Sequence, residues 1–575
     1  MDLLLLHAPS VYDFREHAIL YGPVSDMVPS STVFEMYPLG FLTIASHLHD
    51  RGLDVRIVNL AVRMMDDPAF DVPGFLAGVA PRAIGIDLHW LPHAHGALEV
   101  ARLCKERHPD VPVIMGGLSA SYFHEELVRY PQVDCVLRGD STEEPLHRLL
   151  EALRTGREPV DVPNLTWKRH GEVHVNPHDY LPATLDGADL RPDVIARMVL
   201  RHRDLAGAMP MQGWRRNPLM ALLALKGCGH DCVTCGASRT ACTRITRREH
   251  PAFRSPASLV ANMAALSRVS RAPIYLVGDV LQAGPEAAAE LLDRLRHARL
   301  PNEIVFEFLD LPGEDFLREI DRHVRRWGME ISPETHDPAL RTALDGEPSY
   351  DNARLEAVLA EALRLRCRRI DVFFMIGLPG QTRASVMETV DYCERLFGLG
   401  DARLGCYVSP MGPFLDPGSR GFEDPGRHGY RLFARTLEEH RRLLVQPTWE
   451  HMLNYETRWM TRRELVDATY DAAERLNALK ARHRRIPRRQ ARAVAGRIAA
   501  ARALRSRLEQ ATTAAGAVPD ELLGDIRRFS VSTVCDKREL FGSRHLFALR
   551  PLGLARLALA AWFSPPPNAP RAARP

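Results

Sequence analysis

Three cysteines lie close together in the glycine-rich stretch Gly227-Cys228-Gly229-His230-Asp231-Cys232-Val233-Thr234-Cys235. They are separated by three and then by two residues, and they follow the apolar run at residues 219–225. Three thiolates from one short loop can bind three irons of a cubane iron–sulfur cluster and leave the fourth iron open. An open iron can chelate the amino and carboxyl groups of a small molecule. The spacing therefore predicts a [4Fe–4S] site at Cys228, Cys232 and Cys235.

Two other interpretations of these cysteines stay open at this point. Zinc normally takes four protein ligands in a structural site, and His230 or Cys242 could supply the fourth. The three cysteines could also be unrelated residues of the core.

The composition limits the class of protein. A chain of 575 residues is too long for one ordinary core and suggests about three or four units. Hydrophobic residues make up 46% and charged residues 26%, which is typical of a globular protein. The 75 basic and 72 acidic residues nearly balance, so the overall charge does not indicate nucleic-acid binding. Ten cysteines at uneven spacings indicate reduced thiols rather than a disulfide framework.

The first residues do not resemble a secretion signal, because Asp2 stands where a positive charge is expected and the apolar run ends at His7. No apolar run approaches the roughly 18 residues that a membrane span requires. We therefore expect a soluble cytoplasmic protein without a membrane partner.

The elements that must position the chemistry begin with an N-terminal α/β unit. Short apolar runs at residues 3–6, 55–60, 83–87, 111–115 and 133–137 alternate with helical patterns. One of these helices is opened by Pro38 and closed by Gly52, as is common for helix ends. Such alternation predicts a doubly wound parallel sheet, and ligands on these sheets bind at the carboxyl ends of the strands.

A second alternation follows the cysteine loop. Six apolar runs, at residues 221–225, 274–277, 304–308, 327–332, 370–376 and 403–408, are separated by helical stretches. They predict a partial (β/α)6 barrel whose site lies at the carboxyl ends of its strands. Those ends carry Gly278-Asp279, Ser332-Pro333-Glu334 and Gly377-Leu378-Pro379-Gly380.

The remaining chain suggests a connector and a helical end. Residues 156–215 are rich in Pro, Gly, Asp and Arg, with a short strand signal at 165–167. Beyond residue 424 the pattern changes to long helices at 464–479 and 489–508, and the Pro- and Ala-rich tail 564–575 is predicted to be disordered. The basic run 482–507 lacks interleaved aromatics, so it is predicted to be a solvated helix face and not a nucleic-acid site. The predicted units are 1–155, 156–215, 216–424 and 425–575.

The cysteine loop and these strand ends resemble the radical S-adenosylmethionine (SAM) superfamily. Residues 1–155 resemble the cobalamin-binding domain that precedes many such barrels, through His7-Ala8-Pro9-Ser10, Glu35-Met36-Tyr37-Pro38-Leu39-Gly40, Gly116-Gly117 and Arg138-Gly139-Asp140. The chain departs from the superfamily at Thr234, where an aromatic residue usually precedes the third cysteine. The resemblance implies three cofactors: a [4Fe–4S] cluster, SAM and cobalamin.

The resemblance also implies roles for individual residues. Each acid among them has an alternative role as a helix cap, and Tyr407 is as compatible with core packing as with an adenine contact. The cluster would be bound by Cys228, Cys232 and Cys235. SAM would be bound by Asp279 through its ammonium group, by Ser332 and Glu334 through its ribose, and by Gly377, Pro379 and Tyr407 on its adenine side. Cobalamin would lie against His7, Pro9, Ser10, Gly116, Gly117 and Gly139.

The segment Asp87-Leu88-His89 resembles part of an Asp-x-His-x-x-Gly motif whose histidine binds cobalt in some cobalamin proteins. Here the sixth position is Pro92 instead of glycine, and the segment follows the third strand rather than the first. We therefore expect His89, His93 and His95 to line the cavity or to cap the next helix.

The implied activity is that of a cobalamin-dependent radical SAM methyltransferase acting on an unactivated carbon of a small-molecule natural product. Such an enzyme needs an electron donor such as flavodoxin or ferredoxin. A cyclisation, rearrangement or oxidation without methyl transfer is an alternative outcome of the same cofactors. A metal- or cobalamin-binding sensor protein is an alternative of another class. The remaining cysteines are expected in the core, and Cys535 has no assigned role.

Overall fold

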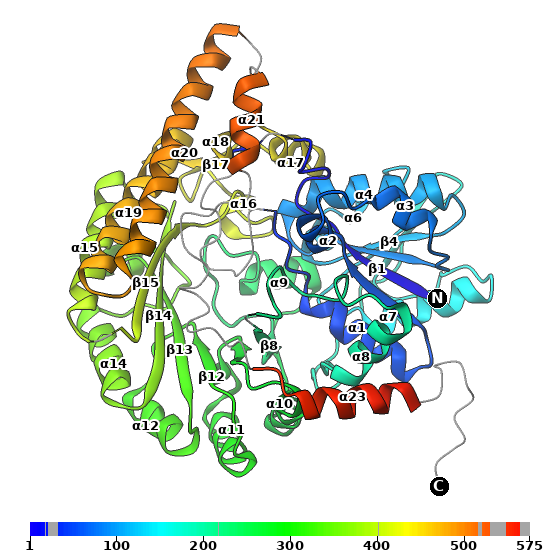
Figure 1. Cartoon of the computed structure of the whole chain (residues 1–575), viewed down its shortest axis with the longest axis horizontal. Coiled ribbons are helices and arrows are strands. Elements are labelled where there is room, and N and C mark those ends of the chain that lie inside the picture. The colour runs from blue at the N-terminus through cyan, green and yellow to red at the C-terminus, as the bar shows by residue number, and fades with distance from the viewer. Residues whose placement is uncertain are drawn as a thin grey trace.

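The computed structural model describes residues 1–17, 19–20, 33–216, 218–400, 402–515, 520–529 and 548–563. A mixed sheet and a parallel sheet lie beside each other, with the N-terminal one in blue and the second one in green in Figure 1. Cys535 and the tail 564–575 fall outside the described residues, so the expectations for them stay untested.

The first sheet has seven strands in the order β2-β1-β3-β4-β5-β6-β7. Its first five strands are parallel, and β6 and β7 extend it as an antiparallel pair. The segment predicted as a connector thus contains two strands of this sheet. The order reverses between β1 and β3, which is where such sheets bind ligands. The strands are β1 (Leu3–His7), β2 (Val55–Asn59), β3 (Ile84–Asp87), β4 (Val113–Gly116), β5 (Cys135–Leu137), β6 (Leu165–Arg169) and β7 (Glu172–Val175).

Helices cover both faces of the first sheet, as the doubly wound prediction required. Leu4 and Leu6 of β1 pack into one core, whereas Leu3 and Leu5 pack into another that includes Phe41 of α1. This alternation follows from the period of two along a strand. The helices are α1 (Leu39–Asp50), α2 (Leu60–Asp66), α3 (Val72–Ala77), α4 (Ala94–Arg107), α5 (Leu118–Tyr122), α6 (His124–Leu127), α7 (Glu143–Arg154) and α8 (Pro192–His202), with the 3-10 turn η1 (Leu91–His93) before α4.

The second sheet confirms the partial barrel. Its six strands are all parallel and run in the order β15-β14-β13-β12-β11-β8. The strands are β8 (Met220–Leu223), β11 (Ile274–Val277), β12 (Ile304–Phe308), β13 (Trp327–Glu334), β14 (Cys367–Ile376) and β15 (Leu404–Pro410). The accompanying helices are α9 (Arg239–Thr246), α10 (Pro256–Val269), α11 (Pro285–Ala298), α12 (Glu314–His323), α13 (Pro338–Ala343), α14 (Asn352–Arg364) and α15 (Arg383–Phe397), with the 3-10 turn η2 (Val280–Ala283) before α11.

Two short antiparallel pairs complete the strands of the described chain. The pair β9 (Leu225–Lys226) with β10 (Ala252–Phe253) encloses the cysteine loop, and β16 (Tyr430–Leu432) pairs with β17 (Tyr455–Thr457).

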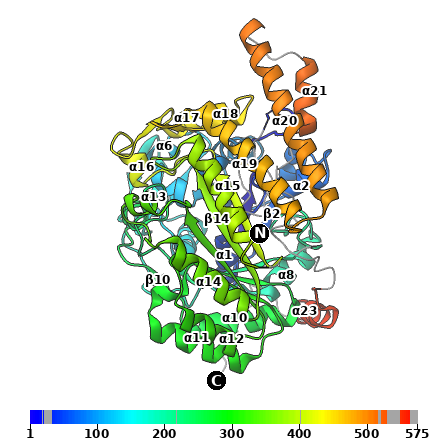
Figure 2. The ribbon, with the colours of Figure 1, turned by 90° about the vertical axis from the view of Figure 1, so that its left-hand side faces the viewer.

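The C-terminal helices do not form one separate body. α19 packs on α15 and β15, so it covers the edge strand of the barrel. α20 and α21 pack against each other and project from the molecule in Figure 2. α23 returns to α8 and α10 below the two sheets in Figure 1. The helices beyond β15 are α16 (Arg420–Glu423), α17 (Leu437–Leu444), α18 (Trp449–Met452), α19 (Arg462–Arg482), α20 (Arg488–Ala515), α21 (Asp520–Phe529) and α23 (Pro551–Phe563).

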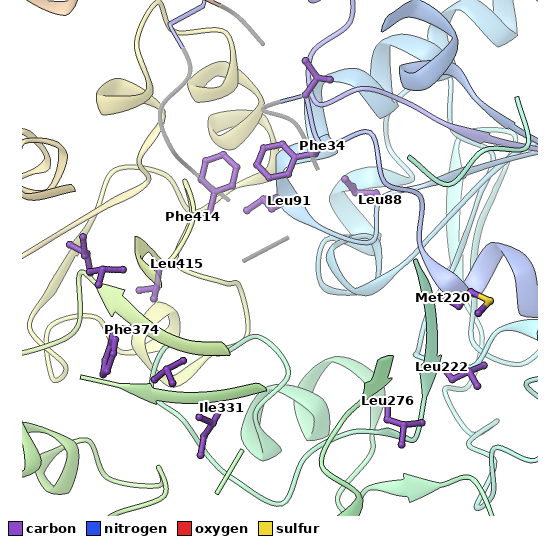
Figure 3. Packing of buried hydrophobic residues seen from close by; sticks show 14 of the residues in the cluster. Phe34, Leu88, Leu91, Met220, Leu222, Leu276, Ile331, Phe374, Phe414 and Leu415 are labelled. Carbon is purple, nitrogen blue, oxygen red and sulfur yellow. The ribbon is translucent and has the colours of Figure 1, made fainter. Parts of the chain in front are cut away.

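One hydrophobic core joins the two sheets. Phe34 and Leu91 from the first unit lie near Phe414, which follows β15 (Figure 3). The same core continues to Ile331 of β13 and Phe374 of β14. The carboxyl ends of both sheets are therefore held in a set relation to each other. Within the described residues, no helix is both long and apolar enough to cross a membrane.

Candidate functional site

The cysteine loop runs from β9 to α9. Ser238 caps α9 by accepting the amide of Ala241 at 3.3 Å, which fixes the point where the loop becomes a helix. The sulfur of Cys228 accepts the amide of His230 at 3.4 Å, and that of Cys235 accepts the amide of Ala237 at 3.3 Å. Amide donors stabilise the negative charge of an iron-bound thiolate, and all three cysteines are partly exposed.

Cys242 differs from these three. It is buried, and its thiol donates to the carbonyl oxygen of Ala237 at 3.3 Å. Four zinc ligands at about 2.3 Å from the ion would lie within about 4 Å of one another. Among the described residues, no close-set group of three or more potential metal ligands includes a cysteine of this loop. The donor set thus fits a cluster better than a zinc ion.

The turn after β11 contacts the cysteine loop. Gln282 accepts the amide of Gly229 at 2.8 Å and donates to the sulfur of Cys228 at 3.6 Å. Asp279 caps this turn, with one carboxylate oxygen accepting the amide of Leu281 at 2.9 Å and the other that of Leu309 at 3.1 Å. The structure thus gives Asp279 the capping role that the sequence had left as an alternative, and it is Gln282 that touches the loop.

A pair of carboxyl groups lies on the other side of the loop. Burial raises the pKa of Glu334 well above its usual value, and the neighbouring Glu347 raises it further. Glu334 ends β13 after a register shift and has a φ of 65°, an uncommon conformation for this residue type. Arg341 is 1% exposed and donates to the carbonyl of Pro333 at 3.2 Å, which holds the turn that presents Glu334. Ser332 lies two residues before Glu334 on the same strand and is half-buried.

The glycine-rich turn after β14 is held by hydrogen bonds from two side chains. The side chain of Gln381 accepts a hydrogen bond from the amide of Gly377 at 2.8 Å. The hydroxyl of Tyr430 donates to the carbonyl oxygen of Gly377 at 2.9 Å. A Cβ on Gly377 would lie 2.8 Å from the hydroxyl oxygen of Tyr455. The glycine is therefore required by the packing of Tyr455, while Pro379 remains partly exposed at the tip of the turn.

Tyr407 belongs to a buried polar layer of the barrel. Its ring stacks on Phe373 with a centroid distance of 5.0 Å, and the ammonium group of Lys480 lies 4.6 Å from its centroid. Its hydroxyl donates to Asp371 at 3.5 Å. These contacts are those of a core residue, which is the second of the two roles expected for Tyr407.

Histidines and an aspartate gather at the switch point of the first sheet. At the end of β1, Nδ1 of His7 lies 2.9 Å from a carboxylate oxygen of Asp87, and Nε2 lies 3.1 Å from the carbonyl oxygen of Phe34. The ring of His89 lies with Nδ1 2.6 Å from the other oxygen of Asp87. His93 stacks obliquely on both rings, with centroids 4.8 Å apart. His7, Asp87 and His89 form a group whose ligand atoms lie within 4.8 Å of one another.

The other residues predicted for cobalamin line the same edge. Ser10 is fully buried, and no described residue is a hydrogen-bond partner of its hydroxyl, so a polar group is left for a ligand. The carbonyl of Pro9 lies so close to α4 that a Cβ on Gly96 would be 1.8 Å from it. Gly139 has a φ of 106°, and its amide donates to Ser121 at 2.9 Å.

Gly117 supports this edge in a way that the sequence did not indicate. Its φ is 118°, and a Cβ there would stand 2.4 Å from the Cα atom of His89. The glycine is thus needed for the backbone of His89 to pass, and its contact with cobalamin stays a prediction. The nearest atom to a Cβ on the preceding Gly116 would be a carbonyl oxygen 3.6 Å away.

We expect Gly117→Ala to lower the free energy of unfolding by about 1–3 kcal/mol, because alanine meets both the positive φ and the backbone of His89. Gly116→Ala is the matched control and should change it by less than about 1 kcal/mol. Urea unfolding followed by tryptophan fluorescence measures both variants. Equal effects at the two positions would contradict this account of Gly117.

Two connections join the histidine edge to the cysteine loop. Trp90 donates from its indole nitrogen to one oxygen of Asp416 at 3.2 Å, and the amide of Gly236 donates to the other at 3.1 Å. Arg248, just beyond α9, donates to both carboxylate oxygens of Asp140 at the end of β5. The two candidate sites therefore form one composite site between the sheets.

Sequence analysis missed several residues of this site. Trp90, Asp416, Gln282 and Arg248 act on partners distant in the sequence, and none lies in a recognisable motif. Only the burial of a charged residue near the cysteines could have signalled Arg248, and burial is not visible in the sequence.

Comparison with known proteins agrees with this architecture. Residues 27–147 match the B12 binding domain family. The hopanoid C-3 methylase of Methylococcus capsulatus is 23% identical over 314 residues, which cover 53% of this chain and 54% of the methylase. An uncharacterized methyltransferase of Pyrococcus horikoshii is 27% identical over 205 residues, covering 35% of this chain and 40% of that protein. The chain thus spans about half the length, or less, of these curated relatives.

Two solved structures share the fold. The radical S-adenosylmethionine methyltransferase TsrM from Kitasatospora setae, solved with tryptophan and a SAM analogue, superimposes with a TM-score of 0.55 and 17% identity, covering 76% of this chain and 79% of that one. The cobalamin-dependent S-adenosylmethionine radical enzyme OxsB, with aqua-cobalamin and SAM bound, gives a TM-score of 0.53 and 12% identity, covering 98% and 78%. The chain resembles cobalamin-dependent radical SAM proteins in fold, from the first sheet through the barrel.

Proposed function

We propose that this chain is a cobalamin-dependent radical SAM methyltransferase that acts on a small-molecule substrate. The observation that carries the proposal is Asp416, whose two oxygens bind Trp90 beside the histidine edge and Gly236 beside Cys235. This contact joins a site suited to cobalamin to a loop suited to a [4Fe–4S] cluster. Three of the four proteins compared above are named as methylating enzymes, which supports the choice of methyl transfer.

The chain's own residues would bind and orient the three cofactors. Cys228, Cys232 and Cys235 would hold the cluster, and the amides of His230 and Ala237 would stabilise charge on two of the sulfurs. Ser332, Glu334, Gly377 and Pro379 would form the SAM surface, with Asp279 shaping the turn that carries Gln282. His7, Ser10 and Gly139 would line the cobalamin side. When bound, the cluster and SAM supply radical chemistry and cobalamin supplies a transferable methyl group.

Burial of this composite site suits such chemistry. Trp90 and Gly236 both donate to Asp416. Burial raises the pKa of the Asp416 carboxyl group, and these two hydrogen bonds offset only part of that rise. The two hydrogen bonds to Asp416 hold the histidine edge and the cysteine loop close to each other. The electron donor would be a separate protein such as flavodoxin or ferredoxin, and the site would lie in the cytoplasm.

The proposal is tested with anaerobically reconstituted protein, hydroxocobalamin, a reductant and SAM carrying a deuterated methyl group. We expect 5′-deoxyadenosine to form and a metabolite of an extract to gain one CD3 group in place of a hydrogen. Cyclisation, rearrangement or oxidation would yield 5′-deoxyadenosine with a product that gains no CD3 group. Failure to form 5′-deoxyadenosine with the cluster loaded would overturn the proposal and favour a sensor protein.

A further inference from the structure

A small basic cavity lies where the first unit meets α9, the helix between the two sheets in Figure 1. Its volume is about 170 Å³, and its lining comes from α5, α6, the residue after β5, the segment after β7 and the end of α9. None of the described lining residues is acidic, and five are basic: His124, Arg138, His178, Arg244 and Arg247. Such a lining indicates a site for a negatively charged ligand.

Arg138 is a buried cation in this lining without an acidic partner. It is 7% exposed, and its Nε and Nη2 atoms donate to the carbonyl oxygens of Asn164, Leu165 and Asn176. Within the described chain Arg138 forms no ion pair, and its Nη1 atom forms no hydrogen bond. Burial, followed by the charge of Arg247, lowers the pKa of Arg138 to about 10, so the guanidinium stays charged at neutral pH. A buried charge of this kind is stabilised when an anion binds beside it.

Two histidines line the cavity beside Arg138. Nε2 of His178 is buried and makes no hydrogen bond with any residue that the structure describes. Burial, followed by the charge of Arg138, lowers the pKa of His178 to about 4, and the same two causes lower the pKa of His124 to about 4. The charge of Arg138 thus disfavours further positive charge in the cavity, an effect that a bound anion would offset.

The cavity adjoins a larger open groove along α9, because Arg244 and Arg247 line both of them. The groove has a volume of about 630 Å³ and is also lined by Arg239 and Glu249. Arg244 pairs with Glu423. Arg247 is exposed and forms no ion pair with a described residue, so its charge is available to a ligand. A ligand that places an anionic group in the cavity would therefore have room for the rest of the molecule in the groove.

The donors of the cavity suit a phosphate group better than a carboxylate. They come from several elements that surround the cavity, so they approach a bound group from different directions. A phosphate is tetrahedral and offers three or more acceptor oxygens, whereas a carboxylate offers two in one plane. Arginine is also the side chain best matched to phosphate.

We propose that this cavity binds the phosphate group of a small phosphorylated ligand other than cobalamin, with Arg138 and Arg247 as its cationic partners. The body of the ligand would lie in the groove along α9, outside the composite site. Since the lining comes from the first unit and from α9, the bound phosphate would also hold these two parts together.

The test titrates the full chain with inorganic phosphate at constant ionic strength, followed by calorimetry. We expect saturable binding of about one phosphate per chain. Arg247→Gln should weaken it about tenfold to a hundredfold, because it removes a charge-assisted hydrogen bond. Arg138→Gln should have an effect of the same size, and unchanged affinity in either folded variant would overturn the proposal. Arg247 is exposed, so its variant decides the matter even where Arg138→Gln does not fold.

Arg239→Gln is the matched control, because Arg239 is also an exposed arginine of this segment but lines only the groove. It should change the affinity for inorganic phosphate by less than about twofold. Equal weakening by Arg239→Gln and Arg247→Gln would mean that phosphate is attracted only by the general charge of this surface. That result, or the absence of saturable binding, would overturn the proposal.

A second titration determines whether the phosphate belongs to cobalamin, which carries one in its nucleotide arm. The question arises because a Cβ on Gly139 would lie 3.2 Å from Nε2 of His178. Protein loaded with hydroxocobalamin should bind inorganic phosphate as tightly as protein loaded with cobinamide, which lacks the nucleotide and its phosphate. Loss of binding with hydroxocobalamin alone would overturn a separate ligand. Protein that takes up neither corrinoid would contradict the proposed function, and the first titration would still decide the phosphate site.

Discussion

Replacing Cys228, Cys232 or Cys235 by alanine should abolish the iron–sulfur cluster, and Cys242→Ala should leave it intact. Each of the three sulfurs would bind a different iron, so the loss of one leaves two irons of the cubane without a protein thiolate. Cys242 is buried and its thiol donates to Ala237, so we expect it to take no part in the cluster. The measurement is iron and sulfide content after anaerobic reconstitution, with about four irons per chain expected.

Cys242→Ala is the matched control, because it removes a cysteine seven residues beyond Cys235 in the same segment. Loss of iron in this variant would mean that the cluster has four protein ligands and no open iron. Stoichiometric zinc in the protein as purified, unaffected by iron and sulfide, would support the zinc interpretation and rule out the cluster.

Arg248→Met should lower the free energy of unfolding by about 3–5 kcal/mol, because it leaves the carboxylate of Asp140 buried without its cation. The two side chains are only 3% and 11% exposed. The guanidinium donates from Nε and Nη2 to separate oxygens, a bidentate pairing. Asp140 follows β5 and Arg248 follows α9, so the substitution weakens the contact between the first sheet and the cysteine loop.

Arg244→Met is the control for this prediction, since Arg244 lies on α9 and pairs with Glu423 at the surface. Its side chain is 45% exposed, and we expect a loss of no more than about 1 kcal/mol. The double variant Asp140→Leu with Arg248→Met should recover part of the loss, because neither charge is then buried alone. A double variant less stable than Arg248→Met would contradict this account. Urea unfolding followed by circular dichroism measures all three.

The sequence by itself determined the fold of both sheets. Short apolar runs bounded by glycine and polar residues specify parallel strands because both faces of such strands are buried. The strand ends were therefore predicted to within a few residues, from β1 at Leu3–His7 to β15 at Leu404–Pro410. The sequence indicated a short strand at residues 165–167, but it did not show that β6 and β7 belong to the first sheet. Which strand they pair with is not encoded in a local pattern of residues.

The cysteine loop was also determined by sequence, since its ligands lie within eight consecutive residues. Local spacing suffices where one short loop supplies all the donors. The sequence pattern also placed Glu334 and Gly377 at strand ends near that loop, because the carboxyl ends of parallel strands meet at one edge.

Only the tertiary structure decided which residues act on one another across the chain. His7 and Asp87 are 80 positions apart, and Trp90 and Asp416 are 326 apart. Their pairing depends on how the two sheets pack, and no local pattern encodes that packing. For the same reason Gly117 proved to accommodate the backbone of His89, and Asp279 proved to cap a turn. Residue types and spacings thus specified the chemistry available, and burial and orientation in the folded chain decided which side chains are free to perform it.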